Sequence, residues 1–201
     1  MLALFYQILF LILSYFIAAI PFGLVITKFF AGIDVRQGGS KNIGATNVVR
    51  LAGKKLGLIT LLLDGAKGWL MVIIASFLFQ DTSFLHLYLS LVALTCVLAH
   101  IYPIYLNFQG GKGVATAIAV LLALNLNVGV LAIITWLISF LILRISSVSS
   151  LLAIFSTVIY SIITFESIVQ IIFTIILFGI IAYRHKENIL RLKNGEEKKV
   201  K

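Results

Sequence analysis

Cysteine is almost absent from this chain of 201 residues, which holds one, Cys96, inside an apolar stretch. A single cysteine cannot form a disulfide within the chain, so the class of small disulfide-stapled proteins is excluded. A lone thiol in apolar surroundings indicates packing and not redox chemistry.

Charged residues are also scarce, at 11% of the chain, and only seven of them are acidic. With 61% hydrophobic residues and a mean hydropathy of +1.13, the chain does not fit a water-soluble globule and is expected to be a polytopic membrane protein. The seven acids and three histidines form no cluster with metal-ligand spacing, so we expect no metal and no cofactor. The Asp-rich or His-Asp sets of phosphoalcohol transferases and lipid phosphatases are missing.

Long apolar runs fill most of the chain, and polar breaks separate them. The first run starts at Met1 with no Lys or Arg before it, so we expect it to remain as a span and not to be a cleaved signal peptide. Seven transmembrane helices are predicted, with five as the competing count, in one all-α bundle that forms a single domain over residues 1–201. The predicted spans cover residues 3–27, 56–79, 85–106, 113–124, 128–143, 150–164 and 168–183.

Positive charge predicts the orientation of this bundle, because Lys and Arg stay in cytoplasmic loops. Six of the sixteen lie within residues 28–55 and seven follow residue 183. With seven spans and the N-terminus outside, every loop with Lys or Arg faces the cytoplasm, and so does the C-terminus. Five spans would place Arg144 outside, and six would place the basic tail there. The lysines at the C-terminal end are assigned to orientation and to attraction of anionic lipid headgroups, whereas the first basic segment, residues 28–55, is not, and no nucleic-acid partner is expected for this chain of net charge +9.

This layout gathers four polar segments at one face of the bundle: residues 28–55, 107–113, 144–150 and 184–201. In one of them, glycines 110, 111 and 113 surround Lys112 just before a predicted helix, a pattern that suits a phosphate-binding turn. The first segment combines glycines with hydroxyl and amide side chains that can donate to phosphate oxygens. These are Ser40, Asn42, Thr46 and Asn47, beside Lys41.

Asp64 and Lys67 stand at i, i+3 within the second span, where ionisable residues are costly. Gly65 and Gly68 flank the pair, so we interpret it as a structural ion pair that allows another helix to approach; a direct substrate role is the alternative. Alanines 115, 119 and 123 form a small-residue face for such close packing.

The strings Gly39–Arg50, Asp64–Gly68, His100–Pro103 leading into Gly110–Gly113, and Arg184–Leu192 resemble the bacterial acyl-phosphate:glycerol-3-phosphate acyltransferase family, PlsY. Four motifs in the same order are more specific than any one of them. Two positions depart from the family pattern: Lys41 and Ala99 each stand where glycine is expected.

The resemblance implies transfer of a fatty acyl group from acyl phosphate to the sn-1 hydroxyl of glycerol 3-phosphate, without coenzyme A. It implies that Ser40 and Arg50 act on the acyl-phosphate end, and that Lys112 and its glycines hold the phosphate of glycerol 3-phosphate. His185 and Asn188 would orient the attacking hydroxyl. The proton acceptor is either His185 or a substrate phosphate, and the phosphate is slightly preferred.

Ser149 and Ser150 are additional candidates for phosphate binding, and Glu197 is assigned a structural role. The implied partners are the two substrates and membrane lipid, and a soluble enzyme that forms acyl phosphate is a candidate partner. A transporter or channel for phosphorylated anions is the alternative function. It is disfavoured because the loops cluster at one face and no internal repeat is evident.

Overall fold

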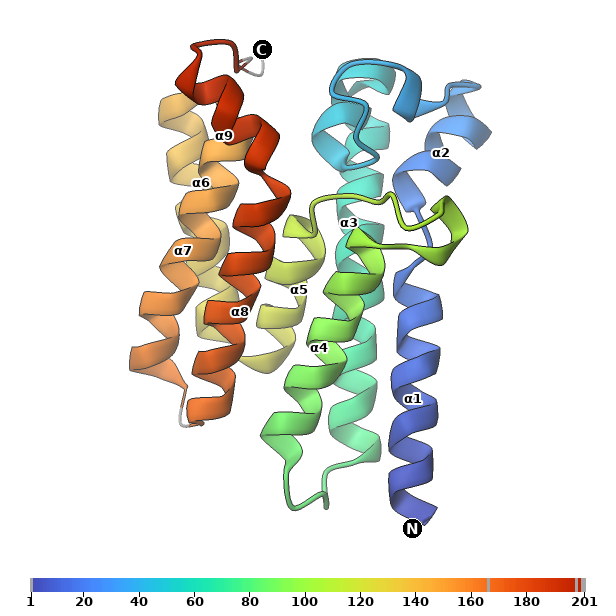
Figure 1. Ribbon diagram of the computed structural model, residues 1–201, viewed down its shortest axis with the longest axis vertical. Helices are drawn as coiled ribbons and strands as arrows, with labels where there is room; N and C mark the ends of the chain where they lie inside the picture. Colours follow the sequence, from blue (N-terminus) through green and yellow to red (C-terminus); the bar gives the residue numbers. More distant parts are fainter. Residues whose placement is uncertain (1, 166, 198, 200–201) are drawn as a thin grey trace.

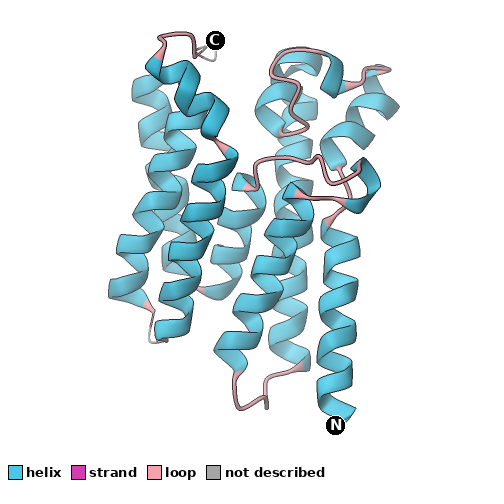
Figure 2. Cartoon of the chain, in the orientation of Figure 1, coloured by secondary structure: helices cyan, strands magenta, loops and turns pink. Residues whose placement is uncertain are grey.

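The computed structural model describes residues 2–165, 167–197 and 199, and the secondary structure within them is helical (Figures 1 and 2). The long helices run side by side along one common direction. Two 3₁₀ turns, Val35–Gln37 and Ile104–Leu106, lie in the connections. The helices are α1 (Leu2–Ala18), α2 (Phe22–Ala31), α3 (Ala45–Leu78), α4 (Leu85–Ile101), α5 (Val114–Leu124), α6 (Leu126–Leu143), α7 (Ser146–Thr164), α8 (Ile168–Arg184) and α9 (Lys186–Lys193).

The outer faces of the bundle are apolar. Phe77, Ile142 and Ile163 are each more than 70% exposed, and many other large apolar side chains of α1, α6 and α8 also face outward. Such a surface is unstable in water and matches the hydrocarbon interior of a bilayer.

The seven predicted spans each fall on helix in the structure, but the number of crossings is not settled by helix length. Five helical segments are long and apolar enough to cross a membrane, and six if α8 and α9, bent by 59°, count as one span. Helix α5 has 11 residues and is therefore about 16 Å long, roughly half the hydrocarbon thickness. Seven crossings therefore stays a prediction.

The first three predicted spans differ from the helices of the structure, each for a local reason. The first span is broken around Pro21, which lacks a backbone N–H and separates α1 from α2. The second helix starts eleven residues early, at Ala45, and bends at Gly53, which has a φ of 86°. The third ends at Ile101, before Pro103, and not at residue 106. Helix α9 was not predicted.

Helix α5 packs between α3 and α6 and makes its most extensive contact with α3. A Cβ atom on Gly65 would lie 3.3 Å from Ala119 Cβ, and one on Gly68 would lie 2.7 Å from Thr116 Cγ2. The two glycines therefore permit the close approach that the small-residue pattern predicted. The hydroxyl of Thr116 also donates to the Asp64 carbonyl, at 2.8 Å, and ties the two helices together.

The described parts of the four polar segments lie at the same end of the bundle, opposite the start of α1 (Figure 1). The connection 79–84, the end of α7 and the start of α8 lie at the other end. Three charges of the predicted layout, Glu166, Lys198 and Lys201, fall outside the described residues. Which end faces the cytoplasm stays a prediction.

Candidate functional site

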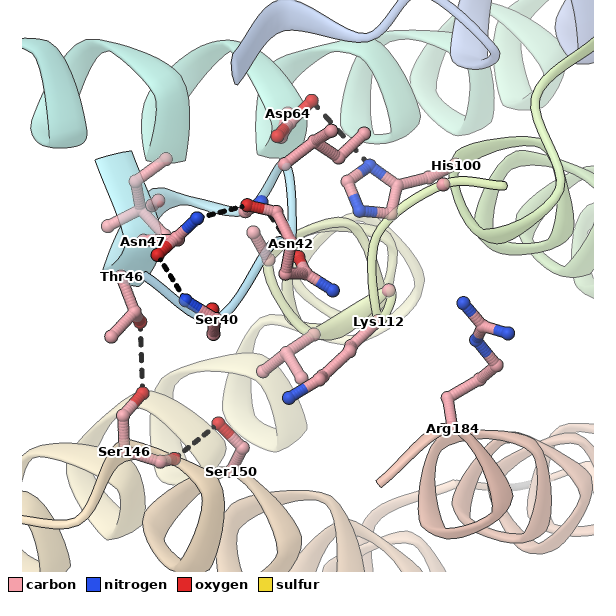
Figure 3. Close-up of a pocket in the computed structure, with 18 of the residues that line it drawn as sticks. Ser40, Asn42, Thr46, Asn47, Asp64, His100, Lys112, Ser146, Ser150 and Arg184 are labelled. Atoms are coloured by element: carbon pink, nitrogen blue, oxygen red, sulfur yellow. Dashed lines mark hydrogen bonds and ion pairs between the residues drawn. The ribbon is translucent and has the colours of Figure 1, made fainter. Parts of the chain in front are cut away.

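A cavity of about 1610 Å³ opens at the polar end of the bundle, and residues from each of the four polar segments line it. Figure 3 shows side chains from the loop before α3, from the start of α5, from α7 and from α8 facing one another around it. Twelve of the predicted catalytic and substrate-binding residues belong to its lining: Ser40, Lys41, Asn42, Thr46, Asn47, Arg50, Gly110, Lys112, Gly113, Ser150, His185 and Asn188. The sequence prediction that these segments come together is confirmed.

Three helices begin at this cavity, and none of them has a side-chain cap. Gly44 precedes α3, Gly113 precedes α5 and Ile145 precedes α7, and none of these positions contributes a capping side chain. The first backbone N–H groups of a helix lack partners within the helix and carry partial positive charge. The cavity wall therefore offers uncommitted donors suited to anions.

The first polar segment is held in shape by Asn47, which is 2% exposed. Its amide oxygen accepts from the Ser40 N–H at 2.8 Å, and its amide nitrogen donates to the carbonyls of Val35, Gly38 and Asn42. Because its polar atoms are committed to the backbone, Asn47 serves the loop and is not free for the direct substrate contact predicted for it.

Asn42 and Lys41 also shape this loop. Asn42 accepts from the Gly44 N–H at 2.8 Å and leaves its amide nitrogen for the cavity. Lys41 adopts a φ of 57°, a left-handed conformation that favours glycine, which explains why glycine is expected there. The exposed side chains of Ser40, Lys41 and Arg50 are turned to the cavity mouth.

The glycine loop departs from its predicted geometry. The N–H groups of Gly110 and Gly111 do not point at a common anion, because they donate to the carbonyls of Ile101 and His100, at 3.0 and 3.1 Å. Added Cβ atoms would lie 2.2 Å from the His100 carbonyl oxygen at Gly110, and 2.1 Å from His100 Nε2 at Gly111. These two glycines let the loop fold against the end of α4. Lys112 and the start of α5 are therefore the parts of this loop that can bind an anion.

Lys112 projects into the cavity and donates to the side-chain oxygen of Asn188. Burial, followed by repulsion from Arg191 and Arg50, lowers the pKa of Lys112 to about 8, although Glu197 opposes the shift. The ammonium group is therefore charged at neutral pH but poorly solvated, a state that favours capture of an anion.

Asn188 and Lys112 are fixed by Glu197, which closes the C-terminal segment onto the bundle. One Glu197 oxygen accepts from Ser147 at 2.7 Å and from Asn188 at 2.6 Å, and the other accepts from Arg191 at 2.8 Å. Burial would raise the pKa of Glu197, but these hydrogen bonds and Arg191 together lower it. This network supports the structural role predicted for Glu197.

His185 joins α8 to α9 and is 2% exposed. Its Nδ1 lies 2.8 Å from the Ile181 carbonyl, so Nδ1 carries the proton and Nε2 is left as an acceptor. Burial, followed by the positive charge of Lys112, lowers the pKa of His185 to about 4. The ring is therefore neutral at physiological pH.

The serines at the start of α7 that line the cavity differ from those predicted. Ser149 is fully buried, donates to the Ile145 carbonyl at 3.0 Å and does not line the cavity, so its predicted substrate contact is not supported. Helix α7 begins at Ser146, and the helical repeat turns Ser146, Ser147 and Ser150 to the cavity instead. Ser146 meets Thr46 across the cavity at 3.0 Å (Figure 3).

Arg184 and His100 were missed as site residues. Arg184 stacks over the Tyr102 ring at 5.4 Å, points a terminal nitrogen to the Gly111 carbonyl at 3.4 Å, and leaves its buried Nε without a partner among the described residues. His100 is 4% exposed and lines the cavity beside the glycine loop. The available signal was their place inside the recognised motifs.

The predicted ion pair is present beneath the cavity. Lys67 Nζ lies 2.9 Å from Asp64 Oδ1 and donates to the Ile20 carbonyl, at the break between α1 and α2, at 2.8 Å. Asp64 lines the cavity and Lys67 does not. The pair therefore braces three helical segments next to the site.

Away from its polar mouth the cavity continues as an apolar groove over α5. Its walls come from α3 and α6, its floor is made largely of small and aliphatic side chains, and Trp69 and Trp136 are its largest residues. Trp136 is held by stacking on Phe140 and by a hydrogen bond from its ring nitrogen to Ser150, at 3.1 Å. The groove suits a hydrocarbon chain whose polar end lies at the mouth.

Metal ligands do not cluster in the described part of the chain. Within residues 2–165, 167–197 and 199, no three His, Cys, Asp or Glu side chains are placed to hold a metal ion. A metal-free and cofactor-free reaction stays a prediction.

A helical bundle with an apolar outer surface, and with an anion-binding cavity that continues into an apolar groove, defines an integral membrane protein that acts on acylated or lipid-like anions. The profile of the family described as Glycerol-3-phosphate acyltransferase matches residues 8–195. The chain belongs to this family and is an integral membrane acyltransferase.

Individual relatives agree with this assignment. Proteins named glycerol-3-phosphate acyltransferase from Pelagibacter ubique and Myxococcus xanthus are 45% and 44% identical over 188 residues. The alignments cover 94% of this chain and 94% and 96% of those proteins. The transporter alternative is not supported by these matches.

Two crystal structures have the same fold. PlsY, an integral membrane glycerol 3-phosphate acyltransferase, matches in its glycerol 3-phosphate form with a TM-score of 0.91 at 37% identity, and in its lysophosphatidic acid form with 0.87 at 35%. Each match covers 98% of this chain and 96% of the other.

Proposed function

We propose that this enzyme transfers a fatty acyl group from acyl phosphate to the sn-1 hydroxyl of glycerol 3-phosphate, giving lysophosphatidic acid and inorganic phosphate. The observation that carries the proposal is the single cavity that joins a cationic mouth to an apolar groove. An acyl phosphate needs both environments at once, and glycerol 3-phosphate needs the mouth alone.

The two phosphate groups are assigned to opposite sides of the mouth. Lys112, with the uncapped start of α5, would bind the phosphate of glycerol 3-phosphate. Ser40 and Arg50, with the start of α3, would bind the phosphate of the acyl donor, whose chain then enters the groove. The Ser146 and Ser150 face of α7 lies beside the start of α3, with the Ser146 hydroxyl at 3.0 Å from that of Thr46. We infer that Arg184 adds a further charge for the shared anions.

The chemical step needs positioning more than a nucleophilic side chain, because acyl phosphate is already activated. The hydroxyl oxygen attacks the acyl carbonyl carbon, an ester bond forms, the bond from that carbon to the phosphate oxygen breaks, and phosphate leaves with the bonding electrons. Alignment of two bound reactants can supply about 7 to 11 kcal/mol of the barrier. The surrounding donors stabilise the charge that develops in the transition state.

The hydroxyl proton passes to a substrate phosphate in this account. His185 is poorly suited as the base, because a group with a pKa of about 4 holds a proton weakly at neutral pH. A phosphate with a second pKa near ~6 is a stronger base in that range. Neutral His185 would accept a hydrogen bond from the hydroxyl at Nε2 and fix its direction.

We infer that the polar end of the bundle faces the cytoplasm. The loops with most of the Lys and Arg residues lie at that end, and these residues favour the cytoplasmic side. Both substrates would then reach the site from the inner leaflet.

The direct test is an assay of the purified protein with palmitoyl phosphate and labelled glycerol 3-phosphate in the presence of EDTA. We expect labelled lysophosphatidic acid and inorganic phosphate in equal amounts. Lys112→Ala should lower kcat/KM for glycerol 3-phosphate by about 10- to 100-fold, because a hydrogen bond to a charged group is lost.

Two results would contradict the proposal. Activity with palmitoyl-coenzyme A but not with palmitoyl phosphate would refute the acyl donor. Complete loss of activity with EDTA and recovery with Mg²⁺ would refute the metal-free mechanism.

A further inference from the structure

Asp64 and His100 are buried polar residues that the proposed chemistry does not use. Their side chains are 2% and 4% exposed, and His100 Nδ1 lies 3.6 Å from Asp64 Oδ1 (Figure 3), a charge contact too long for a hydrogen bond, so that Nδ1 has no hydrogen-bond partner among the described residues. Buried polar groups of this kind are costly inside a membrane protein and are usually retained for a purpose.

Asp64 contacts side chains of its own helix and of α5 beneath the cavity. Its carboxylate pairs with Lys67 at 2.9 Å, and Lys67 in turn binds the carbonyl of Ile20 between α1 and α2. Its backbone carbonyl accepts from Thr116 in the first turn of α5. Asp64 is therefore held at its carboxylate by Lys67 and at its backbone by Thr116, and its orientation is determined by the bundle.

His100 contacts both Asp64 and the glycine loop, residues 110–113, and so links the two. Its carbonyl accepts from the Gly111 N–H at 3.1 Å, and its ring lies directly against the Gly111 Cα, where an added methyl group would be 2.1 Å from Nε2. Lys112 follows immediately. A displaced His100 ring would therefore displace the loop that carries the Lys112 ammonium group.

We propose that His100, which lies between the Asp64 carboxylate and the Gly111 backbone, is a positioning residue for glycerol 3-phosphate: it sets the place of the Gly111–Lys112 backbone and so of the Lys112 charge. The proposal rests on the proposed function. It predicts an effect on the acceptor substrate and none on the acyl donor, because Ser40 lies in the loop before α3 and Arg50 lies near the start of α3, and neither belongs to the glycine loop.

The test measures KM for both substrates in His100→Leu, which keeps the volume of the ring but not its polar atoms. We expect KM for glycerol 3-phosphate to rise about 10- to 100-fold, as displacement of a binding group by about 1 Å can do, while KM for palmitoyl phosphate stays within about twofold. His100→Gln, which keeps a polar group directed to Asp64, should recover part of the loss.

Gly111→Ala is the second variant, and His86→Leu is the matched control. A methyl group at Gly111 meets the ring itself, so this variant should show the same selective rise in KM. His86 is an exposed histidine at the opposite end of α4, and its replacement should change neither KM.

The outcomes separate this proposal from the proposed function. Failure of the unaltered enzyme to form lysophosphatidic acid would refute the function itself. An active enzyme in which His100→Leu raises both KM values equally, or lowers only the melting temperature, would overturn the positioning role alone.

Discussion

At the scale of single residues, the charge of Lys112 decides how the acceptor substrate is bound. Its pKa, lowered to about 8, means that the ammonium group is charged below this pH and becomes neutral as the pH rises through it. We therefore expect kcat/KM for glycerol 3-phosphate, which reports the free enzyme, to fall by up to about tenfold per pH unit above pH ~8. A pH profile of initial rates checks this.

Lys112→Arg is the matched control for that profile, because arginine keeps its charge throughout the range. Its activity should be lower at neutral pH but should not decline between about pH 8 and 9.5. The same alkaline decline in the arginine variant would show that another group titrates.

His185 makes a different pH prediction. With a pKa of about 4, its ring stays neutral from about pH 5 upward, so it contributes no rise in rate through the usual imidazole range. His185→Ala should lose about 100-fold in kcat through lost orientation of the hydroxyl, by the same factor between about pH 5 and 8.

Parallel pH profiles of the unaltered enzyme and of His185→Ala provide the measurement. If the rate of the unaltered enzyme rises near pH 6.5 and that of the variant does not, His185 is the general base and substrate-assisted proton transfer is wrong.

The residue types predicted which positions belong to the site, but they were a poorer guide to the direction in which each side chain points. The polar and basic side chains of the first segment were recognisable because glycines and amides are unusual next to apolar spans. The sequence could not predict that Ser146 lines the cavity and Ser149 does not, because this depends on the residue at which α7 begins. Asn47 looked like a substrate donor, yet its geometry commits it to its own loop.

At the scale of elements, close packing of α3 on α5 fixes the floor of the groove. In Gly68→Leu the added side chain would start 2.7 Å from Thr116 and 2.9 Å from Val120. We expect a loss of about 1 to 3 kcal/mol in stability from overpacking, seen as a lower melting temperature in detergent.

Gly179→Leu in α8 is the control, since a Cβ atom there meets nothing within 4 Å. Leucine has a higher helix propensity than glycine, so the melting temperature should stay the same or rise slightly. Equal destabilisation by both substitutions would show that the loss at Gly68 reflects bulk in any helix and not the α3–α5 contact.

The helices themselves were largely predictable from apolar runs, because a bilayer demands long apolar segments. The interruptions and ends of the helices were harder to predict. Gly53 interrupts a helix without ending it, and the extension of α3 through Thr46 and Asn47 runs through polar residues that hydropathy assigns to a loop. Hydropathy also cannot distinguish a short packed helix such as α5 from a full span.

At the scale of the whole molecule, the site exists only because four distant polar segments meet at one end of the bundle. Charge distribution predicted this meeting, since loops with Lys and Arg share one side of a membrane. The i, i+3 spacing predicted the Asp64–Lys67 pair, but the sequence could not predict that His100 meets Asp64 beneath the cavity, because that contact depends on the packing of α3 against α4.

The most direct test of the convergence of these segments is sided labelling of single cysteines in sealed membrane vesicles, with Cys96 replaced by alanine. Lys41→Cys and Glu187→Cys place thiols in two segments of the cavity lining that are far apart in sequence. An impermeant thiol reagent should label both from the cytoplasmic side, and glycerol 3-phosphate with a non-reactive acyl phosphonate should slow both reactions. Labelling of the two positions from opposite sides of the membrane would contradict the account.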